Sequence, residues 1–325
     1  MQKYPFQITT KILNLVGEIS ELVGRISISS QLSHSPQLRR SNRIRTIYSS
    51  LAIEQNSLSL DQVTAVIAGK RVLAPQREIM EVVNAYEIYD QIDRLNPYSV
   101  ADLLMAHGVM MRGLKEDAGE FRTRPVGVVD SEGNVIHVGT LPAYVPQAIA
   151  DLLGWAEHDE TNFLIKSCVF HYEFELIHPF SDGNGRIGRL WHTLLLSKWH
   201  PMFAWLPVES IVHDRQDAYY RAINKSNLEA DSTVFIEFML DAIKTALIEV
   251  SDTTAFSVPS KADQMASREQ AVIYLLNENG EISNSDVREL FSVSPATANR
   301  ILNSMITKNL ITRFRQGKSW AYKKL

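Results

Sequence analysis

The sequence predicts a mainly α-helical protein, with one β-hairpin inside a large helical core and a small C-terminal domain of a different type. Apolar residues recur every three or four positions through most of the first 250 residues, which is the period of helices that bury one face. Two short β-branched runs interrupt that period around Asp130–Asn134, the pattern of a hairpin. Beyond residue 266 the predicted order becomes helix, helix, turn, helix and two strands. These three observations define the expected fold class.

The helical core is predicted element by element from its apolar stripes. The first helix covers 11–28, and its apolar stripe consists of Ile12, Leu15, Val16, Ile19, Leu22, Val23 and Ile26. The second covers 39–54, with Ile44, Ile47, Tyr48 and Leu51 on one side. Further helices are predicted at 75–95, 99–111, 144–158, 162–177, 186–199, 213–224 and 233–250. The strands of the hairpin are predicted at 126–129 and 135–138.

Length and composition bound the class of protein. A chain of 325 residues, 45% of them hydrophobic, suits about two globular domains of ~150 residues each. The net charge of −4 argues against a protein that binds polyanions over its whole surface, although a local basic patch stays open. The one cysteine, Cys168, allows no disulfide within the chain and is expected to be a small buried side chain. No signal peptide or membrane span is predicted, so we expect a cytoplasmic protein without membrane partners.

Two domains and a linker are predicted. The first domain covers 1–250, and the segment 251–266 is small, polar and aperiodic, which is typical of a linker. The second domain covers 267–325. Its helices are expected at 267–279, 284–291 and 295–310, and its strands within 310–325. Ser294 followed by Pro295 marks the start of the third helix. This order is that of a winged helix-turn-helix domain.

The stretch IHPFSDGNGRIGRLW, residues 177–191, collects residue types that bind phosphate. Pro179 disfavours helical geometry at His178, so the helix before it ends there and a new helix begins near Gly185. Gly183, Asn184 and Gly185 can turn the backbone so that its N–H groups converge at that helix start, which forms an anion site. The structural alternative is an ordinary helix–helix turn capped by Asn184 or Asp182.

The two arginines of this stretch favour the anion site. Arg186 and Arg189 are three residues apart, hence on one helix face, in the first turns where the helix dipole disfavours cations by ~0.3–1 kcal/mol each. A bound anion would reverse that penalty, whereas the alternative is a solvated arginine pair.

Asp182 and His178 add a metal ligand and a base to this stretch. Asp182 can cap a helix, or it can hold a Mg²⁺ that bridges phosphate oxygens. His178 can accept a proton near neutral pH, although a lone histidine is more often structural. The phosphate-binding loop of the P-loop enzymes, the glycine loop of kinases and the usual zinc motifs are absent from the sequence. The pattern therefore indicates a site for a nucleotide and a hydroxyl acceptor.

The segment HPFSDGNGRIGR resembles the motif H-P-F-x-[DE]-G-N-G-R-x-x-R of the Fic family at every specified position. The resemblance covers about residues 1 to 250 and implies transfer of AMP from ATP to a Tyr, Ser or Thr hydroxyl of a protein, with release of pyrophosphate. It implies that His178 is the general base and that Asp182 holds Mg²⁺. It further implies phosphate contacts for Gly183, Asn184, Gly185, Arg186 and Arg189, with Asn184 at the α-phosphate, Arg186 at the β-phosphate and Arg189 at the γ-phosphate.

The same resemblance gives roles to two other segments. The hairpin at 126–138 matches the flap on which Fic proteins dock the main chain of a target protein. The helix at about 40–56 resembles the inhibitory helix with the pattern [ST]-x-x-x-E-[GN]. Ser50 and Glu54 fit that pattern, whereas Gln55 departs from it and Asn56 follows one place later. The family pattern implies that Glu54 pairs with Arg189 and blocks productive ATP binding. The alternative is a solvent-facing glutamate at a helix end.

The C-terminal domain carries the most basic stretch of the chain. Residues 313–324 include five cations and no acid, with Trp320 and Tyr322 among them. Thr297 and Arg300 lie on the open side of the predicted recognition helix. With Arg313, Arg315 and Lys318 they are the candidate DNA-binding residues. A wing in solvent, or a winged helix that contacts protein or forms a dimer, is the alternative.

Several readings of function stay open from the sequence. The chain could be an adenylyltransferase inhibited by Glu54, a related enzyme that removes AMP, or a DNA-binding regulator whose Fic core senses nucleotide. A homodimer is compatible with all three. His171 and His192 are expected to serve packing, as are Tyr219 and Tyr220, although the tyrosines could reach an adenine.

Overall fold

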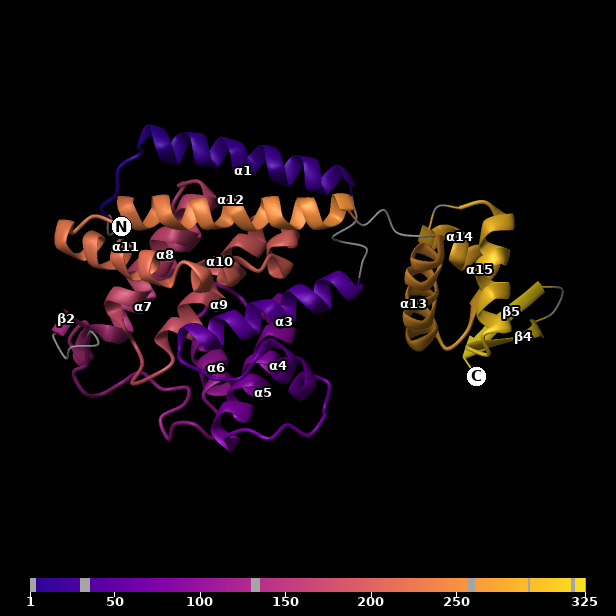
Figure 1. The fold of residues 1–325 in the computed structure, drawn as a ribbon, viewed down its shortest axis with the longest axis horizontal. Coiled ribbons are helices and arrows are strands. Elements are labelled where there is room, and N and C mark those ends of the chain that lie inside the picture. The colour runs from indigo at the N-terminus through magenta and orange to yellow at the C-terminus, as the bar shows by residue number, and fades with distance from the viewer. Residues whose placement is uncertain are drawn as a thin grey trace. The chain divides into compact units, whose positions relative to one another are not determined.

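A computed structural model gives the fold of the chain (Figure 1). It describes all residues except 1–3, 30–35, 130–134, 257–260, 292, 317–318 and 325. The chain divides into two compact units, whose boundary in the sequence lies between Asp252 and Thr253. Among the described helices, none has both the length and the apolar composition that a membrane crossing requires.

The first unit is helical apart from one hairpin, as predicted. Its α-helices are α1 Thr10–Ser29, α3 Pro36–Ile53, α4 Leu60–Ile67, α5 Gln76–Asp90, α6 Val100–Met110, α7 Val145–His158, α8 Phe163–Ile177, α9 Asn184–Trp199, α10 Val208–Asp214, α11 Gln216–Glu229 and α12 Thr233–Phe256. Short 3₁₀ helices lie at Ile92–Arg94, Pro142–Tyr144 and Pro201–Trp205. The two strands are β1 Gly127–Val129 and β2 Val135–Val138.

Helices α8 and α9 form the centre of this unit. Both are buried along most of their length; α8 is apolar on most sides, whereas α9 also buries polar side chains such as Arg186, Arg189 and His192. They pack against each other, and α7 covers α8. Phe170, Phe174 and Trp191 are completely buried between these elements. Because the stretch 178–183 joins α8 to α9, a packed core holds it at both ends.

Helices α1 and α12 run side by side and parallel (Figure 1). Lys11 pairs with Glu237 at 3.2 Å. About two turns further along both helices, Lys244 pairs with Glu18 at 2.5 Å. Most of the apolar stripe predicted for α1 is buried, as Ile12, Leu15, Ile19, Val23 and Ile26 all join the core. The period read from the sequence is therefore confirmed for this helix.

The hairpin forms where the sequence predicts it. Strands β1 and β2 are antiparallel, with Gly127 opposite Val138 and an irregularity between Val128 and Val129. The predicted turn, residues 130–134, lies outside the described residues. At the open end Gly139 donates its backbone N–H to the Val126 carbonyl at 3.1 Å. The two ends of the hairpin therefore leave the core together.

The second unit has the winged-helix order. Its elements are α13 Lys261–Asn279, β3 Ile282–Ser283, α14 Asn284–Phe291, α15 Pro295–Thr307, β4 Ile311–Gln316 and β5 Ser319–Lys324. The strand order is β3-β5-β4, and both pairings are antiparallel. Val272, Ile301, Leu302 and Met305 are buried in its core. Ser294 caps α15 as predicted, since its hydroxyl accepts the Thr297 N–H at 3.3 Å.

Two local predictions were wrong, and one segment has more helix than expected. The boundary between the two units falls inside the segment 251–266 that was predicted as linker, but much of that segment is helical, because α12 continues to Phe256 and α13 begins at Lys261. Helix α4 was not predicted, although Ser59 and Gln62 form a capping box at its start. The helix predicted at 213–224 is interrupted at Arg215, where α10 ends and α11 begins.

Candidate active site

The loop between α8 and α9 is closed by its own side chains. Helix α8 ends at Ile177, and His178 takes a left-handed conformation with φ 51° and ψ 62°, since the following Pro179 disfavours helical geometry at that position. Asn184 closes the loop, because its amide accepts the Phe180 N–H and donates to the Phe180 carbonyl, both at 2.9 Å. The Asn184 side chain thus holds the loop, which differs from the phosphate contact that the resemblance implies for it.

Helix α9 begins with an open N-terminus inside this loop. Gly183 has φ 83°, a conformation that favours glycine, and a Cβ there would lie 2.7 Å from the Met111 sulfur. The Gly183 N–H donates to Asp182 Oδ1 at 2.7 Å. The next N–H groups belong to the first turn, which has no intrahelical acceptors to offer them, so they suit an anion.

Arg189 is buried and is held by the end of helix α3. Its side chain is 3% exposed, and its Nε donates to the Ser50 hydroxyl at 3.0 Å. One terminal nitrogen donates to the Ser50 carbonyl at 2.9 Å and to Glu54 Oε1 at 2.7 Å. Burial alone would lower the pKa of the Arg189 guanidinium, but the charge and hydrogen bond of Glu54, with smaller help from Tyr219 and Glu175, raise it. Glu54 therefore pairs with Arg189, the contact that the family resemblance implies, and Ser50 holds the same side chain.

Glu54 also lies over the helix N-terminus. Its carboxylate packs directly on Gly185, so that any Cβ at that position would collide with it and with Arg189. The Glu54 side chain is 30% exposed, which places it at the mouth of the site. A carboxylate of the protein thus lies against the first turn of α9, whose N–H groups suit an anion.

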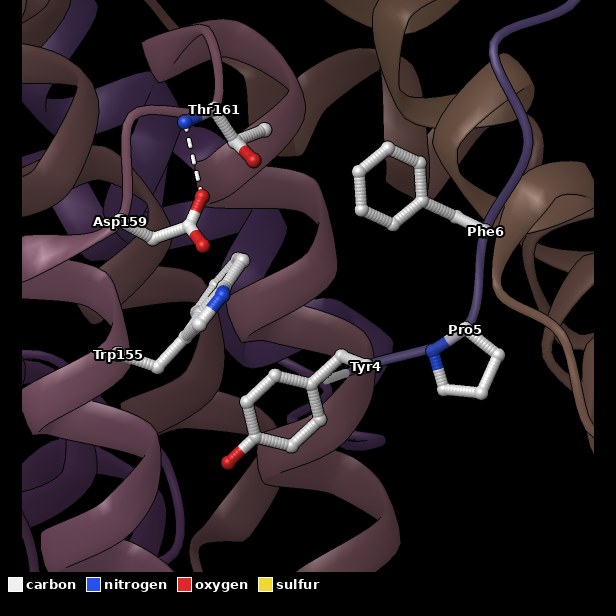
Figure 2. A pocket seen from close by; sticks show the side chains of 6 residues that line it. All are labelled: Tyr4, Pro5, Phe6, Trp155, Asp159 and Thr161. Atoms are coloured by element: carbon white, nitrogen blue, oxygen red, sulfur yellow. Dashed lines mark hydrogen bonds between the residues drawn. The ribbon is translucent and has the colours of Figure 1, made fainter. Parts of the chain in front are cut away.

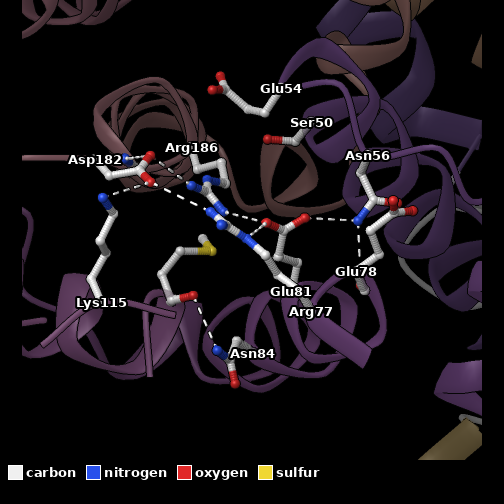
Figure 3. Close-up of polar contacts among 12 residues, drawn as sticks. Ser50, Glu54, Asn56, Arg77, Glu78, Glu81, Asn84, Lys115, Asp182 and Arg186 are labelled. Atoms are coloured by element: carbon white, nitrogen blue, oxygen red, sulfur yellow. Dashed lines mark hydrogen bonds and ion pairs between the residues drawn. The ribbon is translucent and has the colours of Figure 1, made fainter. Parts of the chain in front are cut away.

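Arg186 has acidic partners of its own (Figure 3). It donates to Asp182 Oδ1 at 3.1 Å and lies 3.6 Å from Glu81 Oε1, and its side chain is 5% exposed. The other oxygen of Glu81 accepts a hydrogen bond from Asn56 at 2.8 Å. The Arg186 Nε is buried with no hydrogen-bond partner among the described residues. The segment that follows α3 therefore contacts both arginines. Glu54 pairs with Arg189 directly, and Asn56 is linked to Arg186 through Glu81.

The backbone at Gln55 explains why the inhibitory pattern prefers Gly or Asn at this position. Gln55 has φ 67°, the left-handed region that glycine and asparagine adopt most easily. The family pattern places Gly or Asn at that position, whereas this chain places a residue with a Cβ there. Asn56, one place later, uses its side chain for Glu81 instead.

Replacing Gln55 with glycine is therefore expected to stabilise the protein. Relief of the left-handed strain should raise the free energy of unfolding by about 0.5–1 kcal/mol, after allowance for the greater freedom of glycine in the unfolded chain. Thermal unfolding followed by circular dichroism measures the change. Gln91→Gly is the matched control, because Gln91 has φ −102° and should lose stability on the same substitution. Equal effects of the two substitutions would contradict the strain assigned to Gln55.

Asp182 is suited to a hard cation bound together with phosphates. Its Oδ2 lies 3.6 Å from Lys115 Nζ and 3.8 Å from an Arg77 nitrogen, and its side chain is 29% exposed. Within the part of the chain that the structure describes, no group of three or more His, Cys, Asp or Glu side chains could hold a metal alone. One carboxylate next to a phosphate site is the donor set that Mg²⁺ uses when a nucleotide supplies the other oxygens.

Arg122, which the sequence did not mark, ties the hairpin to the loop. Its buried guanidinium donates to four backbone carbonyls, those of Arg124, Thr140, Ile177 and His178. The distance to the His178 carbonyl is 2.6 Å. Arg122 thus hydrogen-bonds residues on both sides of the hairpin and also the backbone of the predicted base, His178. A single arginine in a loop carries no sequence signal for such a role.

His107 supports the loop from the other side and was also missed. Its ring stacks on Phe180 with centroids 3.7 Å apart. The Gly119 N–H donates to His107 Nδ1 at 2.9 Å, so the proton lies on Nε2, which donates to the Asp182 carbonyl at 3.0 Å. Burial lowers the pKa of His107, which agrees with this neutral tautomer.

The histidines and tyrosines that flank the stretch serve packing. His171 and His192 are buried, and burial lowers the pKa of both, that of His192 to about 3. Tyr219 is buried and contacts His171 at 3.1 Å, whereas Tyr220 is 45% exposed. Cys168 is buried too, and burial raises the pKa of its thiol to about 12. These groups are neutral at physiological pH.

A separate pocket lies at the N-terminal segment (Figure 2). It is lined by Tyr4, Pro5, Phe6, Trp155, Asp159 and Thr161. The rings of Tyr4 and Trp155 meet edge to face at 5.1 Å, and Asp159 accepts the Thr161 N–H at 2.8 Å. No predicted site residue lines it, so the candidate site is the loop between α8 and α9.

The candidate DNA-binding residues lie on two elements of the second unit. Arg300 is exposed on α15, and Thr297 is half-buried in its first turn. Arg313 and Arg315 are exposed on β4 and both stack on Trp320, at 4.9 and 5.4 Å from its ring. Lys318 lies outside the described residues.

Comparison with protein families finds two matches in this chain. The Fic/DOC family matches residues 97–196, and the MarR family matches residues 267–318. Two curated relatives are the protein adenylyltransferases fic-1 of Caenorhabditis briggsae, 30% identical over 228 residues, and of Caenorhabditis elegans, 28% identical over 268 residues. The matches cover 65% and 75% of this chain but only 42% and 49% of those proteins. The chain thus spans less than half the length of either.

Solved structures extend the likeness to the whole chain. A Fic family protein from Desulfovibrio desulfuricans is 42% identical with a TM-score of 0.76, over 100% of this chain and 98% of that one. Fic-1 of Caenorhabditis elegans shares the fold, with a TM-score of 0.59 at 22% identity over 73% of this chain and 70% of that one. The motif, the fold and the full-length relative agree: the chain belongs to the Fic family and ends in a MarR-like winged-helix domain.

Proposed function

We propose that the protein is an adenylyltransferase that moves AMP from ATP to a Tyr, Ser or Thr hydroxyl of a target protein or of its own chain. One observation carries the proposal: two nearly buried arginines, Arg186 and Arg189, stand in the first turns of α9, where only anions offset the helix dipole. The relatives named protein adenylyltransferases support the same reaction.

In this proposal the start of α9 holds the triphosphate. Gly183 provides the left-handed turn before the helix, the backbone N–H groups of Asn184 and Gly185 face the phosphates, Arg186 contacts the β-phosphate and Arg189 the γ-phosphate. Asp182 would hold Mg²⁺, which neutralises phosphate charge when it is bound. Positioning and charge neutralisation then provide most of the catalysis, as in other phosphoryl-type transfers.

His178 acts as the general base. The target hydroxyl oxygen forms a bond to the α-phosphorus, the bond from that phosphorus to the bridging oxygen breaks, and pyrophosphate leaves with its electrons. The hydroxyl proton passes to the His178 imidazole. The Glu175 carbonyl lies 3.3 Å from His178 Nδ1 and can only accept a hydrogen bond, so the proton of the neutral imidazole is assigned to Nδ1 and the transferred proton to Nε2.

The hairpin at 126–138 is the proposed docking site of the target. An extended target segment would pair its backbone with a hairpin strand, which is a common mode of peptide recognition. Arg122 supports this role, because it holds residues on both sides of the hairpin and the carbonyl of His178 at once. A docked main chain would thus lie at a fixed distance from the base.

We also propose that Glu54 inhibits the enzyme. Its carboxylate pairs with Arg189 and lies over Gly185, in the space that a γ-phosphate needs. ATP can then bind only with its triphosphate displaced from the line of attack. The contact from Asn56 to Glu81, and from Glu81 to Arg186, supports the same closed state.

Intact mass spectrometry tests the proposed reaction. The chain, and a Glu54→Gly variant, are incubated with ATP and Mg²⁺ alone and with a cell extract. We expect the mass of one or more AMP groups on the chain or on a protein of the extract. Loss of AMP from a protein that was modified beforehand would instead identify the reverse reaction. Bound ATP without any AMP gain or loss would contradict the proposal.

DNA binding by the C-terminal domain is a second candidate function. It is favoured by the MarR match and by the exposed Arg313 and Arg315, which Trp320 holds side by side on the wing. Such cations would contact phosphates and give largely sequence-independent affinity. In this view the protein would be a DNA-binding regulator whose Fic core senses nucleotide. ATP-dependent labelling of the chain in the absence of DNA would favour the adenylyltransferase over the regulator.

Substitution of the basic residues is expected to weaken DNA binding and its salt dependence. In gel retardation at low salt, Arg300→Ala or Lys318→Ala should reduce affinity for duplex DNA and lower the salt slope by about one per lost phosphate contact. Lys225→Ala is the matched control, because Lys225 is a surface lysine of the first unit that pairs with Glu229. No retardation of the unmodified chain at low salt would exclude this function.

A further inference from the structure

A half-buried carboxylate lies next to the predicted base. Glu175 precedes His178 by three residues on α8, and its Oε2 is 3.9 Å from His178 Nδ1. The other oxygen, Oε1, is buried without a hydrogen-bond partner among the described residues and lies 3.9 Å from His171 Nε2. Nothing in the reaction described so far uses this side chain.

Helix α9 leaves room for this carboxylate at one position. Gly188 stands opposite Glu175, and a Cβ on Gly188 would lie 2.8 Å from Glu175 Oε1. The glycine between the two motif arginines therefore has a local reason: it lets the carboxylate lie between α8 and α9. Any larger residue would push the carboxylate away from its present position.

The titratable and charged groups around Glu175 come from four helices. His171 and His178 face it from the region of α8, Arg189 from α9, Glu54 from the end of α3 and Tyr219 from α11. Burial raises the pKa of Glu175 to about 7, with Arg189 acting to lower it and Glu54 to raise it. The group is thus poised to carry a negative charge when a positive charge appears beside it.

We propose that Glu175 is a positioning residue for His178: its backbone carbonyl orients the imidazole, and its carboxylate stabilises the imidazolium that His178 becomes on accepting the hydroxyl proton. The carbonyl contact at 3.3 Å selects the tautomer with the proton on Nδ1. The carboxylate then provides the opposite charge at 3.9 Å in a site that water reaches poorly. This inference rests on the proposed role of His178 as the base.

Glu173 offers a matched control on the same helix. It lies two residues earlier, on the opposite side of α8 from Glu175. Burial also raises the pKa of Glu173 to about 7. A Glu→Gln change at either position removes a half-buried carboxyl of the same kind, but only the change at 175 removes one that is next to His178.

The test follows the His178 imidazole directly, in the full chain with Glu54→Gly and ¹³C-labelled histidine. The His178 signal is the one lost in a His178→Ala spectrum. We expect Glu175→Gln to lower the pH midpoint of this signal by about one unit, a tenfold loss of proton affinity. Gly188→Ala, which displaces the carboxylate, should act in the same direction, and Glu173→Gln should leave the midpoint unchanged.

Activity provides a second readout in the same variants. The acidic limb of the pH profile of kcat/KM for AMP transfer should move to lower pH in Glu175→Gln by the same amount, with about a tenfold lower rate at pH 8. An unchanged or raised His178 midpoint in both Glu175→Gln and Gly188→Ala, with both variants folded by circular dichroism, would overturn the inference. If no variant transfers AMP, the proposed function fails, while the titration still decides the role of Glu175.

Discussion

Replacing Glu54 with glycine is expected to raise AMP transfer roughly 10- to 100-fold, the usual range of a coupling between an inhibitory contact and a binding site. The reason is that Glu54 pairs with Arg189 and lies over Gly185. In the proposed reaction a γ-phosphate would need both that arginine and the space over that glycine. Transfer is measured as the rate at which radioactive AMP enters the chain or a partner. The affinity for ATP, measured by calorimetry, should change less than the rate of transfer. The proposed Glu54–Arg189 contact displaces the triphosphate from the line of attack but does not prevent ATP from binding.

Glu87→Gln is the matched control for this prediction. Glu87 also pairs with an arginine, Arg112, but on the exposed surface of α5 and at a distance of 2.8 Å. Its loss should leave the rate within about twofold, because exposed pairs contribute little. A Glu54→Gly protein no faster than the unmodified chain would remove the inhibitory role of Glu54 without touching the proposed reaction.

His178→Ala in the Glu54→Gly background is expected to reduce AMP transfer by a factor of about 10² to 10⁴, the range of general base catalysis. The loss should appear in kcat, whereas ATP binding persists because the phosphate contacts come from α9. Single-turnover labelling with saturating ATP measures the change. His158→Ala, at an exposed histidine of α7, serves as the control and should keep full activity.

A residual rate close to that of the parent would exclude His178 as the base. The result also bears on Glu175, because a positioning residue matters only if the group that it positions takes the proton. Loss of ATP binding in His178→Ala would point to a structural role for this residue instead, since its left-handed backbone closes α8.

The sequence predicted the helical fold because its apolar periods are regular, and α1 buries its stripe as that period requires. It also predicted where α8 ends and α9 begins, because Pro179 and Gly183 act through local backbone rules, while phosphate binding by the loop between them stays a prediction. The pairing of Glu54 with Arg189 joins residues 135 positions apart, and only the resemblance to a family could predict it.

Other members of the site have no local signal. Arg122, His107 and Glu81 reach the loop from segments far away in sequence, and each acts through contacts that only the packed core creates. In the sequence Glu175 has nothing to distinguish it from other acidic residues on helices. Its position becomes significant only in the fold, where Gly188 of α9 lies opposite it. The helical turns within the predicted linker could not be expected from the sequence for a different reason, since that segment shows no apolar period.

Parallel incubation of the Glu54→Gly chain with ATP labelled at the α-phosphate or at the γ-phosphate tests the central claim most directly. If the loop at the start of α9 transfers AMP, label from the α-phosphate enters protein, label from the γ-phosphate leaves as pyrophosphate, and His178→Ala abolishes the signal. Protein labelled from the γ-phosphate, or equal α-phosphate labelling with and without His178, would contradict it.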